Sequence, residues 1–323
     1  MKAVLFHQAN EPVAVTDFTL PAIADRVEVH LLASALNRRD LWITKGMYPG
    51  LLPNVILGSD GVGMLEGDRV VINPGLNWGD NEAVQAADFE VLGMPSHGTF
   101  AEYIRIDRAY VHPAPEHLSD HEAAALPLAG VTAYRTLIRR CQAVKGEKVL
   151  VTGAGGGVAM MAVQMAAAIG CEVYVTSGQD EKIQRAVELG AAGGVNYRTD
   201  NWHKELLAMT NGGVNVVIDS AGGSDFGMLP KVCLPGARIG FYGGGQGKWP
   251  ELSPQLLFWR QVSILGSTMG SPTDFAEMLQ FVTDHKIAPI VDKVFSLDNT
   301  MMALSYMERG EQFGKIVIDH RSS

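Results

Sequence analysis

Residues 149–166 read VLVTGAGGGVAMMAVQMA, and the order of residue types in this stretch decides the fold class. Residues 148–152 predict a buried β-strand, a glycine cluster follows at once, and residues 155–168 predict an Ala- and Met-rich helix. Small residues at such a junction allow a tight turn and close approach to a pyrophosphate, and the helix N-terminus offers N–H groups to an anion. The G-x-G-x-x-G spacing is not met, because Ala154, Gly156 and Ala159 take its three positions. The stretch indicates a dinucleotide-binding turn; the alternative is a glycine-rich strand–helix connection without a ligand.

The pattern on either side of this turn differs. Towards the carboxyl end, strands and helices alternate, with strands expected at 172–176, 214–219, 237–242 and 263–265 and a helix at 181–189. Repeated strand–helix units with apolar strands predict a parallel, doubly wound sheet. Towards the amino end the chain reads as β, with strands expected at 27–35, 69–72 and from Gly98. Ser119 and Glu122 form a capping box where the pattern changes, and the tail offers a helix at 275–285 and two short strands.

Composition excludes several classes of protein. The 323 residues suggest two domains or one large one, and 47% apolar with 19% charged residues is a globular composition. A net charge of −9 lacks the basic footprint of a nucleic-acid-binding protein. Three cysteines without a C-x-x-C pair argue against a structural zinc lobe and fit a reducing compartment. No apolar stretch is long enough to span a bilayer and the amino terminus does not read as a signal peptide, so we expect a cytoplasmic protein.

The end of the second strand bears on which nicotinamide cofactor the turn would hold. An enzyme that uses NAD usually has Asp or Glu there to bind the ribose hydroxyls. Here the strand ends in Thr176, Ser177 and Gly178, which leave room for a 2′-phosphate that Lys182 and Arg198 could neutralise. For Lys182 the alternative is a solvated helix face. Asp180 is expected to cap the following helix.

Two dehydrogenase families share features with this chain. The turn resembles that of short-chain dehydrogenases, but no tyrosine has a lysine four residues later and the turn lies mid-chain, so that family is set aside. Eight blocks, in order, resemble the medium-chain dehydrogenase/reductase superfamily and within it the zinc-independent quinone oxidoreductase-like branch. The blocks are ALNRRDLWITKGMYPG from Ala35, LGSDGVG from Leu57, AALPLAGVTAYRTL from Ala124, VTGAGGGVAMMAVQ from Val151, VYVTSGQDEKIQRAVELGAAGGVNY from Val173, VVIDSAGG from Val216, ILGSTMGSP from Ile264 and FGKIVI from Phe313.

This resemblance implies an α/β fold with two domains. A GroES-like β-barrel catalytic domain is expected at 1–122, completed by 271–323, and a Rossmann domain that binds NADP(H) at 123–270. The implied activity is NADPH-dependent reduction, without a metal, of quinones or α,β-unsaturated carbonyl compounds. The family also implies a homodimer joined near the strand at 237–242 and the segment 256–265. The physiological substrate stays open.

The resemblance also implies roles for individual residues. Asn37, Asp40 and Tyr48 would line the substrate site; alternatively Asn37 and Asp40 pin a turn and Tyr48 is a rim aromatic. The cofactor would be held by Thr132, Ala154, Gly155, Gly156, Gly157, Val158, Ser177, Gly178, Lys182, Tyr197, Tyr242, Gly243, Ser267, Thr268 and Met269, with Gly314 and Lys315 closing the pocket.

A metal is not expected. The positions that match the family's catalytic zinc ligands are Asn37, Ser59, Asp60 and Leu128, and amide and aliphatic side chains are poor zinc ligands. His112, His117 and His121 are expected in a solvated loop. The two alternative functions are a zinc-dependent alcohol dehydrogenase and a non-catalytic NADPH-binding protein of structural or RNA-regulatory use.

Two stretches leave the local barrel geometry open. The connection between Gly63 and Gly67 is shorter than is usual in the family, through either a trimmed barrel or a missing segment. Residues 73–97 form a long polar loop, expected to be functional or mobile.

Overall fold

The computed structural model describes residues 1–321, which form two compact units. Unit 1 comprises Met1–Val131 together with the chain from Gly270 onward, and unit 2 is Thr132–Met269. The sequence placed the first boundary after residue 122, but helix α2 (Asp120–Ala125) packs on strands of unit 1 and stays with it. Helix α3 (Pro127–Tyr134) carries the chain into unit 2. Among the described residues, no helix has the length and apolar character needed to cross a membrane.

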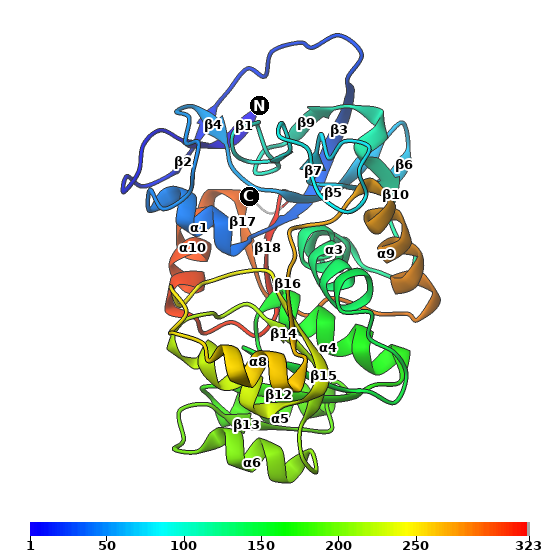
Figure 1. Cartoon of the computed structure of the whole chain (residues 1–323). Helices are drawn as coiled ribbons and strands as arrows, with labels where there is room; N and C mark the ends of the chain where they lie inside the picture. Colours follow the sequence, from blue (N-terminus) through cyan, green and yellow to red (C-terminus); the bar gives the residue numbers. More distant parts are fainter. Residues whose placement is uncertain (322–323) are drawn as a thin grey trace. The chain divides into compact units, whose positions relative to one another are not determined.

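Unit 1 is built on mainly antiparallel sheets (Figure 1). Its strands are β1 (Lys2–Phe6), β2 (Ala14–Asp17), β3 (Val27–Ala35), β4 (Val55–Ile56), β5 (Asp60–Leu65), β6 (Asp68–Ile72), β7 (Gly75–Leu76), β8 (Glu90–Val91), β9 (Tyr103–Ile106), β10 (Val111–Pro113), β17 (Val291–Ser296) and β18 (Lys315–Asp319). Its further helices are α1 (Arg38–Thr44), α9 (Pro272–Asp284) and α10 (Thr300–Arg309), with short 3-10 turns at Arg108–Tyr110 and Leu297–Asn299. The main sheet runs β10-β6-β5-β3-β18-β17, with β9 also pairing β3.

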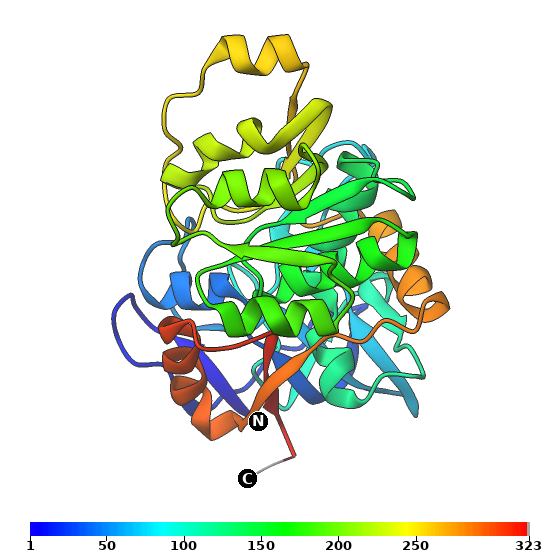
Figure 2. The same cartoon turned by 90° about the horizontal axis from the view of Figure 1, so that it is seen from below.

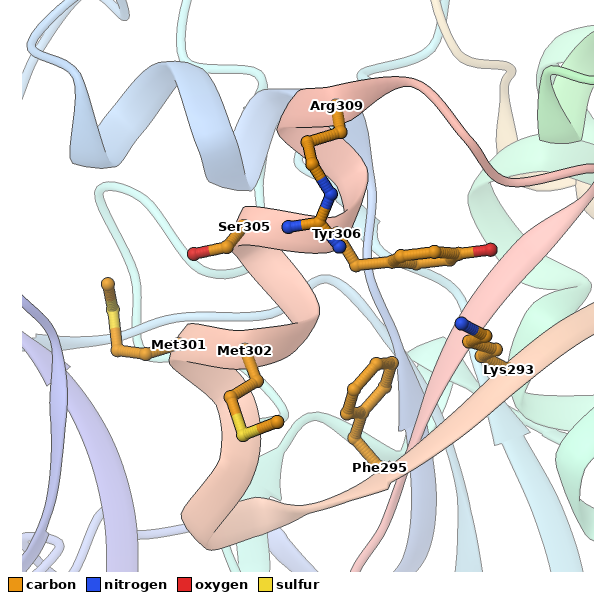
Figure 3. Close-up of a pocket in the computed structure, with 7 residues that line it drawn as sticks. All are labelled: Lys293, Phe295, Met301, Met302, Ser305, Tyr306 and Arg309. Carbon is orange, nitrogen blue, oxygen red and sulfur yellow. The ribbon is translucent and has the colours of Figure 1, made fainter.

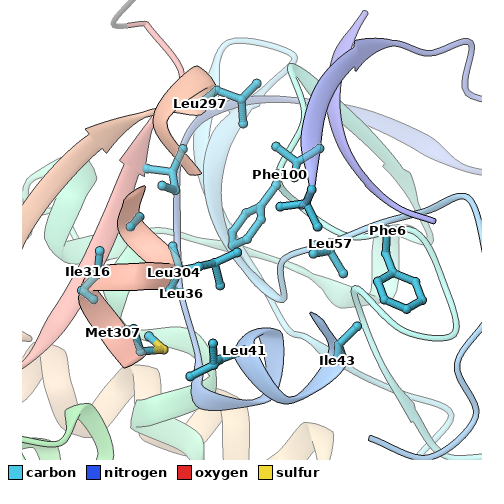
Figure 4. Packing of buried hydrophobic residues seen from close by; sticks show 14 of the residues in the cluster. Phe6, Leu36, Leu41, Ile43, Leu57, Phe100, Leu297, Leu304, Met307 and Ile316 are labelled. Carbon is cyan, nitrogen blue, oxygen red and sulfur yellow. The ribbon is translucent and has the colours of Figure 1, made fainter. Parts of the chain in front are cut away.

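The carboxyl-terminal segment contributes β17 and β18 to this sheet. Strand β18 pairs antiparallel with β3, with Val317 opposite Ala35. This register places Lys315, the first residue of β18, near Leu36 and Asn37, which follow the end of β3. A core of apolar side chains from both ends of the chain packs below it, with Leu36, Leu57 and Phe100 against Leu304 and Ile316 (Figure 4). The GroES-like part of the predicted fold is therefore present.

The two uncertain stretches of unit 1 have definite structures. Leu65 pairs with Asp68, so the short connection is a two-residue hairpin turn, in which Glu66 and Gly67 both have positive φ. The long polar loop carries the β7–β8 pair and buries Trp78 edge-on against Phe89. The short connection thus forms a tight hairpin, and the loop is anchored by its own aromatic contact.

Unit 2 contains a six-stranded parallel sheet ordered β13-β12-β11-β14-β15-β16. The strands are β11 (Lys148–Val151), β12 (Glu172–Ser177), β13 (Gly193–Asn196), β14 (Val214–Asp219), β15 (Cys233–Phe241) and β16 (Ser263–Gly266). Its helices are α4 (Gly157–Ile169), α5 (Asp180–Glu188), α6 (Trp202–Met209), α7 (Leu229–Val232) and α8 (Pro254–Arg260), with a π-helical turn at Arg135–Arg140 and a 3-10 turn at Ser224–Met228. This is the strand order of the Rossmann fold, in which the order of successive strands reverses beside the first strand, here β11.

The sheet of unit 2 ends in an exposed edge. Strand β16 pairs only with β15 in the described sheet, and α8 lies beside it at one end of the unit (gold in Figure 2). Helix α8 leaves Phe258 64% and Trp259 83% exposed. Large apolar side chains next to an open sheet edge are the usual mark of a surface that another chain covers.

Candidate functional site

The glycine-rich turn follows β11, where the order of strands in the sheet of unit 2 reverses. Gly153 and Gly155 have φ of 71° and 105°, a left-handed conformation that side chains other than glycine rarely adopt. The Ala154 N–H donates to Thr176 O at 2.8 Å, which ties the turn to the end of β12. Helix α4 then begins at Gly157, and no side chain caps its N-terminus. The first N–H groups of α4 are thus available to an anion, as a bound pyrophosphate requires.

Polar side chains gather where β12 ends. A Cβ on Gly178 would lie 2.8 Å from both Tyr197 Oη and Arg198 Nε, so only glycine leaves room for these groups. Lys182 reaches back from α5 across the turn, with its Nζ 3.4 Å from where a Cβ of Gly155 would lie. The structure therefore brings together the residues that were expected to contact a 2′-phosphate.

Asp180 does not have its expected role. The N-cap of α5 is Gln179, and Asp180 is the first helical residue. Its carboxylate accepts a hydrogen bond from the Asn196 amide at 2.7 Å. Its charge stands in the first turn of a helix, where the helix dipole favours it. It is held by a partner within unit 2, which leaves the end of β12 itself without an acid.

A second group of expected cofactor residues lies at the ends of β15 and β16. The Ser267 N–H donates to Phe241 O at 2.9 Å, and the Tyr242 N–H donates to Asp219 O at 3.1 Å. These bonds align Tyr242–Gly243 with the segment that holds Ser267, Thr268 and Met269. The Ser267 hydroxyl is buried without a hydrogen-bond partner in the described structure, so it is free to bind a ligand group. Thr132 lies by Met269, with its Oγ1 4.0 Å from the methionine sulfur.

Asp219 anchors the centre of this edge. It ends β14, is buried, and accepts hydrogen bonds from Thr152 Oγ1 at 2.6 Å and from the Gly222 N–H at 3.0 Å. Burial raises its pKa, while these hydrogen bonds oppose the shift. The carboxylate joins the glycine-rich turn to the next loop, a positioning role that the sequence did not reveal.

Unit 1 contains a closed hydrogen-bonded cluster of Asn37, Asp60 and Lys315. The Lys315 ammonium donates to Asn37 Oδ1 at 2.6 Å and to Asp60 Oδ2 at 2.8 Å. The Asn37 amide donates to the same Asp60 oxygen at 2.9 Å. The other Asp60 oxygen accepts the Leu128 N–H at 2.7 Å. Asn37 precedes α1, Asp60 begins β5 and Lys315 begins β18, so the fold joins three distant parts of the chain here.

Gly314 explains how Lys315 reaches this cluster. Its φ is 106°, and a Cβ there would lie 2.3 Å from Ile290 O. Only glycine permits that approach. The Lys315 N–H then donates to Ile290 O at 2.8 Å, which fixes the start of β18.

Asp40 lies beside the cluster and is completely buried. One carboxylate oxygen accepts the Asn37 N–H at 2.7 Å, and this bond is half of a capping box at the start of α1. Its other oxygen has no hydrogen-bond partner in the described structure. Burial raises the pKa of Asp40 to about 6, although the positive charge of Arg39 opposes the shift. Asp40 therefore does pin the turn that carries Asn37, and its raised pKa lets it hold a proton in mildly acidic solution.

Arg39 is a component of the site that the sequence did not indicate. Its guanidinium is buried and donates to Ser59 Oγ at 2.7 Å and to the carbonyl oxygens of Leu92 and Met94 at 2.5 and 2.9 Å. Its Nε donates to the hydroxyl of Tyr48 at 3.2 Å, and it also lies over the tyrosine ring. Because Tyr48 accepts this bond, its own hydroxyl proton remains available to donate. The half-buried tyrosine is thus held in place by a fixed cation.

The residues at the four zinc-ligand positions do not fit a metal. Asn37 and Asp60 bind an ammonium group, Ser59 binds Arg39, and Leu128 contributes only its N–H. Zinc requires thiolate, imidazole or carboxylate ligands with open lone pairs. Across residues 1–321 there is no group of three His, Cys, Asp or Glu side chains arranged to hold a metal ion.

The three histidines expected in a solvated loop are placed differently. His112 lies in β10 against Phe275, and burial lowers its pKa. His117 pairs with Ile287 O at 3.0 Å, and His121, in α2, with Asp319 at 2.7 Å. The prediction of a solvated loop is wrong, because proline-flanked histidines here pack against the carboxyl-terminal segment.

One cavity of about 350 Å³ opens on unit 1 between α10 and β17 (Figure 3). Tyr306 forms its floor, with the Lys293 ammonium 4.0 Å from the ring centroid and Arg309 5.6 Å away. Arg309 pairs with Glu311, and Asp292 accepts a hydrogen bond from the Tyr306 hydroxyl. None of the expected site residues lines this cavity.

Two family models match the chain. An alcohol dehydrogenase GroES-like domain matches residues 24–116, and a zinc-binding dehydrogenase matches residues 157–284. A zinc-type alcohol dehydrogenase-like protein of Schizosaccharomyces pombe is 38% identical over 317 residues, which cover 90% of each chain. Its counterpart in Leptosphaeria maculans is 34% identical over 326 residues, covering 91% of this chain and 90% of that protein.

Solved structures agree over the whole chain. An NAD-dependent alcohol dehydrogenase superposes with a TM-score of 0.93 at 36% identity and covers 99% of both chains. The quinone oxidoreductase of Thermus thermophilus, solved with NADPH, gives a TM-score of 0.83 at 26% identity over 99% of this chain and all of that one. The relatives establish the family. Because their names differ in cofactor and substrate, the cofactor and substrate preference of this chain must be argued from its own residues.

Proposed function

Because this chain belongs to the medium-chain dehydrogenase/reductase superfamily and is an oxidoreductase, we propose that it uses NADPH to reduce quinones or α,β-unsaturated carbonyl compounds without a metal. The observation that carries the proposal is the cluster at the zinc-ligand positions, where Asn37 and Asp60 hold the ammonium of Lys315. Without a Lewis acid, an unactivated ketone or alcohol is not polarised. The substrate must therefore contain an electrophilic carbon that is already activated by conjugation.

In such a substrate, negative charge develops on the carbonyl oxygen as the conjugated carbon is reduced. Asn37 and Tyr48 are the candidate donors to that oxygen, and Asp40 holds the turn that carries Asn37. Arg39 fixes the Tyr48 hydroxyl as an acceptor, so its proton points to a further acceptor. Donors held in this way stabilise developing charge without reorganising during the reaction. Water can complete the protonation.

All of the residues proposed to bind the cofactor lie in unit 2, except Gly314 and Lys315, which lie in unit 1. Bound NADPH supplies the hydride. The α4 N-terminus and the turn 154–158 suit a pyrophosphate, and Ser177, Gly178, Lys182 and Tyr197, together with Arg198, suit a 2′-phosphate. Thr132, Tyr242, Gly243 and the segment 267–269 would hold the nicotinamide.

The direct experiment follows NADPH oxidation with 1,4-benzoquinone and cyclohex-2-enone, and NADP⁺ or NAD⁺ reduction with ethanol. We expect turnover with the first pair and none with ethanol. Efficient ethanol oxidation, lost on chelation, would instead establish a zinc-dependent alcohol dehydrogenase. Tight NADPH binding without turnover of any quinone or enone would indicate the non-catalytic alternative.

We also propose that two copies of this chain pair along β16 and α8. The open edge of β16 offers backbone groups to a partner strand, and the exposed Phe258 and Trp259 lie next to it. A second copy would present the same edge and the same aromatics, which makes the surface self-complementary.

A further inference from the structure

Each hydrogen-bonding group around the side-chain amide of Asn37 can act in only one sense. An ammonium group has donors only, and an ionised carboxylate has acceptors only. Asn37 Oδ1 faces the Lys315 ammonium at 2.6 Å, and Asn37 Nδ2 faces the Asp60 carboxylate at 2.9 Å. If the amide turned over, its NH₂ would face the ammonium and its oxygen would face the carboxylate. Both hydrogen bonds would be replaced by repulsions, so the amide has one stable orientation.

The surroundings of this cluster reinforce that selection. Asp60 is fully buried and Lys315 is 4% exposed, so water does not screen the pair. The Leu128 N–H fixes Asp60 through its other oxygen at 2.7 Å, and Gly314 fixes the start of β18. The charged neighbours are Arg39 and Asp40; Arg39 is directed to Ser59 and Tyr48, and Asp40 to the Asn37 N–H. No neighbouring group in the described structure competes for the amide.

The locked amide has one donor to spare. Asn37 Nδ2 carries two hydrogens, and one of them goes to Asp60. The described structure gives the second no partner, and Asn37 is the most exposed of the three, at 7%. Because Oδ1 accepts from a cation, the amide is polarised and its remaining N–H is a stronger donor.

We propose that Lys315 and Asp60 are positioning residues that lock the Asn37 amide so that it presents an N–H, and not its carbonyl, to the substrate oxygen. This inference rests on the proposed function and deepens it. The ion pair acts through the amide that it orients. Neither charged residue needs to touch the substrate.

The test is the double variant Asp60→Asn/Lys315→Met, which removes both charges and leaves no buried ion unpaired. In it the Leu128 N–H keeps the oxygen of the substituted side chain at position 60 on its own side, so the new NH₂ faces Asn37. The Asn37 amide then turns its oxygen towards that NH₂ and withdraws the free N–H. We expect kcat for quinone reduction to fall by about 10- to 100-fold. This decrease is no larger than the one that follows removal of a single oxyanion-stabilising donor. KM should change less than kcat.

A mutant cycle with Asn37→Ala separates positioning from a merely structural role. Once the amide is absent, the Asp60→Asn/Lys315→Met change should lower kcat by less than about two-fold. An equal loss in both backgrounds, or a double variant with wild-type kcat, would overturn the proposal. Lys45→Met, which removes an exposed ion pair with Glu308, is the control and should leave kcat unchanged. Because all these substitutions lie in unit 1, the circular dichroism spectrum and the thermal unfolding transition of each variant verify that it is folded.

A second readout does not depend on turnover. In the ¹⁵N spectrum of the wild-type protein, the Asn37 side-chain amide should show one proton protected from exchange and one unprotected. The double variant should move both resonances, while Lys45→Met should move neither. Equal exchange of the two protons in the wild type would contradict the lock. If the wild type reduces no quinone or enone, the proposed function fails while this readout still decides the orientation of Asn37.

Discussion

Removal of the Lys182 ammonium group should weaken the binding of NADPH but not that of NADH. Lys182 lies on α5 and reaches across Gly155, next to the end of β12 where Tyr197 and Arg198 flank Gly178. The turn and the strand end are joined by the bond from Ala154 N–H to Thr176 O. A 2′-phosphate at this junction would meet the ammonium group directly. NADH has a hydroxyl in that position and offers no negative charge.

The size of the effect follows from the type of contact. A hydrogen bond to a charged group contributes about 1.5–3 kcal/mol, and every 1.4 kcal/mol is roughly a factor of ten in affinity. Lys182→Ala should therefore raise the Kd for NADPH by roughly 10- to 100-fold and leave the Kd for NADH within about two-fold. Titration of each cofactor against protein fluorescence measures both constants. Lys204→Ala, on the exposed face of α6, is the matched control and should alter neither.

Equal weakening of NADPH and NADH by Lys182→Ala would refute this reasoning, because it would mean that the lysine supports the fold of the turn. Asp180 would then have to be tested as a ribose ligand, with its bond to Asn196 broken first. Wild-type protein that binds NADH as tightly as NADPH would contradict the cofactor preference itself.

Four other outcomes are expected. The purified protein should contain no stoichiometric zinc and keep its turnover in EDTA; about one zinc per chain with loss of activity on chelation would contradict this. Tyr48→Phe should lower kcat by at most about 10²–10³-fold, and a variant equal to wild type on every substrate would remove Tyr48 from the site. Burial raises the pKa of Asp40 from 3.8 to about 6, so its protonated form stabilises the fold at low pH and this contribution is lost as the pH rises through 6. The free energy of unfolding of Asp40→Asn, measured by urea titration, should therefore rise relative to that of the wild type by on the order of 2–3 kcal/mol between pH 4 and pH 7. Light scattering should give about twice the 34.8 kDa chain mass, and Trp259→Lys should shift it to one chain; a monomeric wild type at micromolar concentration would refute the pairing.

The sequence was informative wherever local periodicity and capping decide the structure. The strand expected at 27–35 is β3 with the same bounds, because alternate apolar residues specify a half-buried strand. Ser119 and Glu122 form both hydrogen bonds of the capping box, and Gly170 ends α4 with φ of 90°. Each of these features is determined by residues within a few positions of one another. The alternation of strands and helices likewise predicted a parallel, doubly wound sheet.

Features that depend on distant contacts were missed. A strand was expected from Gly98, but β9 begins at Tyr103. A Cβ on Gly98 would lie 1.9 Å from Gly58 O, so this glycine serves a close approach of two backbone segments. The stretch from Gly98 to Ala101 therefore makes isolated contacts to β1 and to residues 57–58 in place of a continuous strand. Nothing within residues 98–101 distinguishes that use of glycine from a strand start.

The same limit explains the candidate site, where the decisive groups are buried cations. Lysine and arginine are normally exposed, so Arg39 and Lys315 would be assigned to the surface from their residue type alone. Each is buried because acceptors arrive from far along the chain: Asp60 lies 255 positions before Lys315, and Leu92 lies 53 positions after Arg39. The motif blocks identified Asn37 and Lys315 as separate features, one in the substrate site and one closing the cofactor pocket. Only the pairing of β18 with β3 shows that they belong to one hydrogen-bonded cluster, in which Asn37 and Asp60 hold the Lys315 ammonium group.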